Sequence, residues 1–194
     1  MTLELHSFIH LFFTSFIALF PVVNPIGSAF IVNPYFSGLT NRERISAVRR
    51  VALYAFVICV VTMFTGRWIL ALFGLSVPVV KLAGGIMICK IGWEFLSSGS
   101  SSDSEKKAAT EAVPKKINEL EAQLFYPITF PISAGAGTIA VLFTLSAHSD
   151  TSDLRQYLLN SGAVLTSIVS MCVLIFLFYV NANRLISFLG SQNE

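Results

Sequence analysis

Three long runs of this 194-residue chain contain no Asp, Glu, Lys or Arg, and they constrain its fold more than any other feature. The runs are Leu5 to Asn41, Ala122 to Ser149 and Gln156 to Asn183. Each is longer than the ~20 apolar residues that a helix needs to cross the hydrocarbon core of a bilayer. Because only 12% of all residues are charged, against about 25% in soluble domains, the chain cannot cover a water-facing surface. We therefore expect an all-α, polytopic membrane protein with the lipid bilayer as its main partner.

Five apolar segments predict five transmembrane helices in a single membrane domain over residues 1–194. Between the third and the fourth segment, residues 97–116 are rich in Ser, Lys, Glu and Ala, which is typical of a linker without a core of its own. The linker separates a first half, residues 1–96, from a second half, residues 117–194. The five segments are about Leu5–Val32, Val48–Phe73, Val77–Leu96, Leu120–Ala147 and Leu158–Val180.

The distribution of Lys and Arg predicts the orientation of these helices. If the chain crosses the membrane at every segment, nine basic residues fall on one side: Arg42, Arg44, Arg49, Arg50, Lys106, Lys107, Lys115, Lys116 and Arg184. Only Arg155 and Arg67, which lies near the far end of the second segment, fall on the other side, while Lys81 and Lys90 lie within the third segment. Because basic loops stay in the cytoplasm, we expect the N-terminus outside and the linker inside.

The two halves of the chain repeat a proline motif. Phe20-Pro21-Val22-Val23-Asn24-Pro25-Ile26-Gly27 resembles Tyr126-Pro127-Ile128-Thr129-Phe130-Pro131-Ile132-Ser133, offset by 106 residues (127 − 21). Because three crossings precede the linker, the second half enters the membrane from the opposite face. This pattern predicts two inverted repeats, an arrangement common in secondary transporters.

Each motif predicts a broken helix, with the breaks at Pro21 and Pro127 and at the prolines that follow them. Proline lacks an amide N–H and clashes with the carbonyl group one turn earlier, and freed backbone groups at membrane depth must face protein or a cavity. A half-helix that begins after a break presents free N–H groups that favour a carboxylate. The alternative is a pair of proline kinks that serve packing alone. Small and polar residues around the breaks form the candidate substrate site: Asn24, Pro25, Gly27, Ser28, Thr129, Pro131, Ser133, Gly135, Gly137 and Thr138.

At these residues the chain resembles a known family. Asn24-Pro25-Ile26-Gly27, the arginine-rich loop after it, Ala83-Gly84-Gly85-Ile86-Met87 and Phe130 to Ile139 are similar to motifs of the MarC family, inner-membrane proteins of bacteria and archaea within the LysE-type transporter superfamily. The resemblance covers nearly the whole chain. It implies location in a bacterial inner membrane and transport of a small solute, with small neutral amino acids as the cargo. It also implies six helices, so the second half is expected to lack the sixth, and a homodimer could fill the gap.

Other functions have little support in the sequence. No nucleophile, Walker or zinc-protease motif is present, and the membrane segments have almost no acidic residues that could ligate a metal, so we expect neither an enzyme nor a metal or cofactor site. The weak net charge of +2 argues against a nucleic-acid partner. The remaining alternative to a transporter is a non-transporting membrane scaffold or regulatory subunit.

Overall fold

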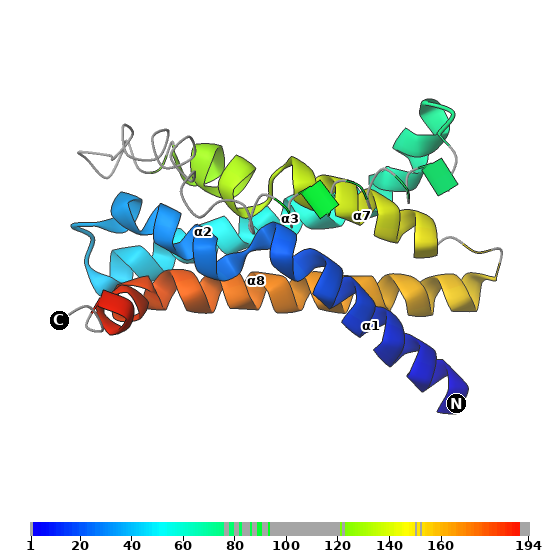
Figure 1. The fold of residues 1–194 in the computed structure, drawn as a ribbon, viewed down its shortest axis with the longest axis horizontal. Helices are drawn as coiled ribbons and strands as arrows, with labels where there is room; N and C mark the ends of the chain where they lie inside the picture. The colour runs from blue at the N-terminus through cyan, green and yellow to red at the C-terminus, as the bar shows by residue number, and fades with distance from the viewer. Residues whose placement is uncertain are drawn as a thin grey trace.

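The computed structural model describes residues 2–75, 121, 123–149, 151 and 153–190, together with isolated positions between 78 and 93. Every element within this part of the chain is helical. The elements are α1 (Thr2–Val23), α2 (Pro25–Val32), η1 (Asn33–Phe36), α3 (Asn41–Leu72), η2 (Leu124–Ser133), α7 (Ala136–Ser149) and α8 (Leu154–Gly190). Figure 1 shows α1 and α8 running in the same direction, with the N-terminal end of α1 diverging from the rest. The predicted all-α membrane fold is confirmed.

The described residues contain three helical stretches long and apolar enough to cross a membrane, and a fourth if a bent pair forms one span. The three are Leu5–Phe36, Asn41–Gly66 and Leu154–Leu185, and the bent pair joins Leu124–Ser133 to Ala136–Ala147 at 61°. They correspond to the first, second, fifth and fourth predicted segments. Most of the third segment and the whole linker at 97–116 lie outside the described residues, so the division into two halves stays a prediction, as does the inverted repeat.

Helix α3 begins earlier than the apolar pattern indicates, because a capping box starts it. The Thr40 backbone amide donates to the Glu43 carboxylate at 2.8 Å, and the Glu43 amide donates to the Thr40 hydroxyl at 3.4 Å. This reciprocal pair satisfies two amides at the start of the helix. The cluster Arg42–Arg50, which we expected in a loop, therefore lies in the first turns of α3.

The two expected helix breaks differ from one another. Pro21 lies inside α1 and does not interrupt it, so the predicted break at Pro21 is wrong. The first interruption is confined to Asn24, and Leu5–Phe36 remains one span. The second interruption is wide, because Tyr126 and Phe130 inside η2 have extended backbone, with φ/ψ of −125°/123° and −118°/122°. These two residues precede Pro127 and Pro131, and the proline ring disfavours helical geometry in the residue before it.

Helix α8 packs against α1, α2 and α3, and α3 packs against α7 and η2. The core between them is apolar, with Val48, Ile128, Leu142 and Val164 fully buried. Large apolar side chains also cover the outside, as expected for a surface in contact with lipid. The two breaks thus lie close together, because α2 and η2 contact each other and α8 lies beside α2.

Candidate functional site

The first break is capped by its own side chain. Asn24 has left-handed backbone (φ 42°, ψ 62°), which Asn adopts more readily than most residues. Its side-chain oxygen accepts a hydrogen bond from the Gly27 amide at 3.1 Å, and its carbonyl oxygen accepts one from the Ser28 hydroxyl at 2.8 Å. Pro25 occupies the first position of α2, where no amide is needed. The predicted ligand Asn24 therefore serves as the N-cap of α2.

In the second break, two hydroxyl groups bind the disrupted backbone. The Thr129 hydroxyl donates to the Leu124 carbonyl oxygen at 2.6 Å, and the Ser133 hydroxyl donates to the Ile128 carbonyl oxygen at 2.8 Å. Thr129 and Ser133 are both almost completely buried, and a buried carbonyl group without a partner would be costly. These two predicted ligands thus have a structural role in stabilising the break.

Helix α7 begins directly after this break, with Ala136 exposed and Thr138 on the buried side of its first turn. Its first intrahelical bond runs from the Ile139 amide to the Gly135 carbonyl oxygen, so the earlier amides have no partner within the helix. Thr138 lies in this first turn, is only 1% exposed, and its hydroxyl has no hydrogen-bond partner in the described part of the chain. The Thr138 hydroxyl and the first amides of α7 are therefore hydrogen-bond donors that a bound solute can use.

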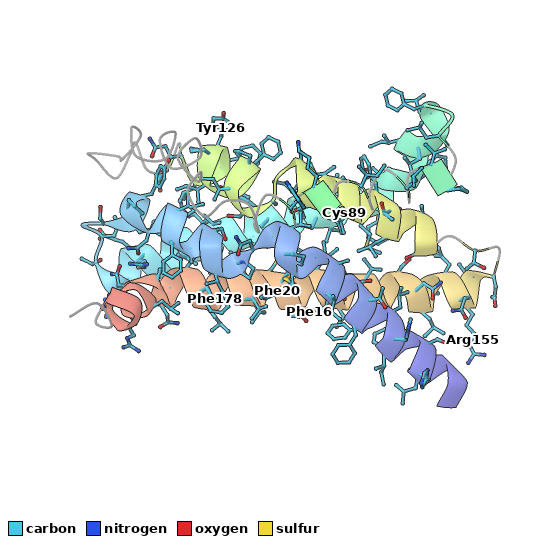
Figure 2. The ribbon with its side chains drawn as sticks, in the orientation of Figure 1. Phe16, Phe20, Cys89, Tyr126, Arg155 and Phe178 are labelled. Carbon is cyan, nitrogen blue, oxygen red and sulfur yellow. The ribbon has the colours of Figure 1, made fainter. Side chains whose placement is uncertain are left out.

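Gly135 allows the chain to turn into α7. A Cβ atom at this position would lie 2.5 Å from the Pro131 carbonyl oxygen, closer than real Cβ atoms approach backbone. Phe130 and Pro131 are partly or fully exposed beside it, and Figure 2 shows Tyr126, at the start of the break, pointing away from the bundle. Only the inner side of the break is therefore buried, and the residues on that side are Thr129, Ser133 and Thr138.

Tyr179 of α8 connects the two breaks, and it is not among the site residues predicted from the sequence. Its hydroxyl lies 2.7 Å from the Ser133 hydroxyl and also interacts with the Ser28 side chain. Because Ser133 donates its only proton to Ile128, Tyr179 is the donor in this pair. Its signal in the sequence was slight: one Tyr near the end of the aliphatic and Phe-rich stretch 172–180.

Arg44 approaches the same residue from the opposite side. Its Nε and Nη2 atoms donate to the Tyr179 carbonyl oxygen at 3.2 and 2.8 Å, and Nη2 donates to the Asn33 side-chain oxygen at 2.6 Å. The guanidinium group lies 5.8 Å from the centre of the Phe36 ring, within the range of a cation–π contact. Arg44 is only 5% exposed. A buried cation is thus held by neutral oxygens and an aromatic ring.

The structure therefore brings Ser28, Ser133 and Tyr179 together and places Thr138 at the start of α7. A separate hollow lies along the outer face of α1, between His6 and Ile17, and none of the predicted site residues line it. Among the residues described, no three His, Cys, Asp or Glu side chains gather closely enough to hold a metal ion.

Comparison with known proteins agrees with the membrane architecture. A sequence model described as "MarC family integral membrane protein" matches residues 9–193. A UPF0056 membrane protein of Archaeoglobus fulgidus is 29% identical over 175 residues, which cover 87% of this chain and 77% of the relative. The UPF0056 membrane protein YvbG of Bacillus subtilis is 32% identical over 164 residues, 84% of this chain and 74% of that protein.

The UPF0056 inner membrane protein MarC of Escherichia coli is 27% identical over 145 residues, which cover 72% of this chain and 61% of that protein. No solved structure matches the chain. The family match extends over nearly the whole sequence and includes both helix breaks. The chain therefore belongs to the MarC family of integral membrane proteins.

Proposed function

We propose that this protein is a secondary transporter of a small solute, such as a small neutral amino acid, and that the solute carboxylate binds at the first turn of α7. The observation that carries the proposal is the buried hydroxyl of Thr138, which has no partner in the described part of the chain, beside amides that have no partner within the helix. A buried donor without a partner costs about 1–3 kcal/mol, and an anionic guest would remove that cost. The amides and the partial positive charge of a helix N-terminus favour the same guest.

The depth of this turn supports a transport site. Helix α7 has 14 residues, so its first turn lies about 20 Å from its far end by helical rise. With the far end of α7 at the membrane surface, the turn would lie well inside a hydrocarbon core that is ~30 Å thick. A site at this depth, between broken helices, is typical of secondary transporters.

The predicted site residues have three kinds of role under this proposal. Gly135, Gly137 and Thr138 contact the carboxylate, because the glycines leave the backbone open and Thr138 adds a hydroxyl donor. Asn24, Thr129 and Ser133 hold the breaks in shape, since each already bonds to the backbone. Pro25 and Pro131 set where the breaks occur.

The substitution Thr138→Val tests the proposal, because it replaces the hydroxyl with a methyl group of similar size. With radiolabelled L-alanine in proteoliposomes, we expect initial uptake to fall at least tenfold. Thermal stability in detergent should stay equal or rise slightly, because an unpartnered buried hydroxyl is removed.

Thr144→Val is the matched control, since Thr144 lies on the same helix and its hydroxyl bonds to the Ala140 carbonyl oxygen. This variant should keep its uptake. Equal uptake in Thr138→Val and wild type would contradict the assignment of the site. If wild-type protein neither binds nor moves any small amino acid in a thermal-shift and uptake screen, the alternative of a non-transporting scaffold or regulatory subunit is favoured.

A further inference from the structure

Tyr179 is held at both ends by different parts of the protein. Its carbonyl oxygen accepts two hydrogen bonds from Arg44 at the start of α3, and its hydroxyl bonds to Ser133 in the second break. In a helix, the carbonyl group points toward the C-terminal end and the side chain leans toward the N-terminal end. Tyr179 therefore extends along the axis of α8, from the arginine-bearing end of the bundle toward the breaks.

The residue also fills the space between these two places. Tyr179 is 1% exposed, and Arg44 beside it is 5% exposed. Asn33 and Phe36, which contact Arg44, belong to the segment η1 that directly follows α2. The contacts of Arg44 and Tyr179 thus join α3, η1, α8 and η2 at one point.

We propose that Tyr179 is a positioning residue that gates the site toward the arginine-bearing end, with Arg44 as the latch that holds it closed. The inference rests on the proposed function, because a gate is needed only where a solute passes. In the closed state described here, Tyr179 donates to Ser133 and thereby fixes the second break. Release of the solute toward the arginine-bearing end requires the Arg44 and Ser133 contacts to separate from Tyr179.

Variants of Tyr179 and variants of Arg44 or its partner Asn33 break the Arg44–Tyr179–Ser133 connection at different points. Tyr179→Phe removes the hydroxyl and leaves the carbonyl group that Arg44 binds. Asn33→Ala removes a side-chain partner of Arg44 and leaves Tyr179 intact, whereas Arg44→Gln removes the charge. Tyr35→Phe is the matched control, because Tyr35 is equally buried and its hydroxyl has no partner in the described part of the chain.

Hydrogen exchange in detergent measures the gate without any solute. We expect Tyr179→Phe, Asn33→Ala and Arg44→Gln to speed exchange of the amides in residues 124–138 at least fivefold, while Tyr35→Phe leaves it unchanged. Faster exchange confined to the start of α3 in Asn33→Ala and Arg44→Gln would overturn the latch. Unchanged exchange at 124–138 in Tyr179→Phe would overturn the gate.

Uptake of L-alanine separates gating from a merely structural role. For equal amounts of folded protein, Tyr179→Phe should lower Vmax at least fivefold and leave KM within twofold, because the solute site is intact while closure fails. Equal loss in Tyr35→Phe, or a KM that rises as much as Vmax falls, would contradict gating. If the wild type moves no alanine, the proposed function fails, while the exchange experiment still decides whether Arg44 and Tyr179 control the break.

Discussion

At the scale of single residues, the hydrogen-bond acceptor of each hydroxyl group distinguishes structural residues from the candidate ligand. Ser28, Thr129 and Ser133 each donate their only proton to a backbone carbonyl group within four or five residues. Ser and Thr commonly make such local bonds. Thr138 does not, although it is equally buried. The same residue types therefore have different roles, and only their hydrogen bonds distinguish them.

Gly27 is required by the cap at the first break. A Cβ atom at this position would collide with the Asn24 side chain, so Gly27→Ala should displace the cap. Loss of an Asn cap costs about 1 kcal/mol, and we expect the midpoint of thermal unfolding in detergent to fall by several degrees. In an Asn24→Gly background, where no side chain is in the way, the Gly27 substitution should have little effect. Equal effects in both backgrounds would show that the collision is not the cause.

At the scale of elements, two motifs with the same proline spacing produce different breaks. The residues before the second prolines differ in conformation, and so do those before the first, since Phe20 is helical and Tyr126 is extended. Asn24 precedes Pro25 and takes left-handed backbone, so the helix resumes after one residue. Phe130 precedes Pro131, and a bulky residue rarely takes that conformation, so the chain becomes extended. The wide break separates η2 from α7, and the chain bends by 61° between them.

Substituting the glycine at this turn should damage the wide break. Gly135→Ala places a Cβ atom 2.5 Å from the Pro131 carbonyl oxygen, so we expect lower thermal stability and loss of L-alanine uptake together. Gly162→Ala in α8 is the control, because its Cβ atom would lie 3.6 Å from the Phe8 ring, an ordinary contact. Alanine favours a helix over glycine by up to about 1 kcal/mol, so this variant should be as stable as wild type or more so. Stable, active Gly135→Ala protein would refute the tight turn.

At the scale of the whole molecule, α1 and α8 are parallel and held side by side. The Ser167 hydroxyl of α8 donates to the Phe12 carbonyl oxygen of α1 at 2.9 Å, and both helices run from the end that carries the N-terminus (Figure 1). The loop at 37–40 and the loop before Leu154 therefore lie at opposite ends of the bundle. One labelled position in each loop is therefore enough to test the orientation of the bundle in the membrane.

Labelling of single cysteines tests the orientation predicted from the basic residues. In protein whose Cys59, Cys89 and Cys172 are replaced, we expect Ser37→Cys to react with a membrane-impermeant maleimide only after cells are broken. Asp153→Cys should react in intact cells, because its exposed loop would lie outside. Both native side chains are exposed, so access depends on the side of the membrane alone. The reverse pattern would invert the predicted topology.

The sequence by itself determined the class of fold and the family. Runs without charged residues that are long enough to cross a bilayer favour helices, because a helix satisfies its own backbone hydrogen bonds. The proline motifs marked the two interrupted regions, although Pro21 itself does not break α1. These features are local or depend on composition, so they can be read along the chain. The family match and the spans at Leu5–Phe36, Asn41–Gly66 and Leu154–Leu185 agree with them.

Only the tertiary structure decided which residues are free to bind and what encloses them. Pro21 is accommodated within α1, Asn24 caps its own helix, and Thr129 and Ser133 bind carbonyl groups, while Thr138 remains unpartnered. Arg44 and Tyr179 are 135 residues apart in sequence, yet they share two hydrogen bonds. Contacts between distant segments form only when the helices pack, so no local pattern predicts them.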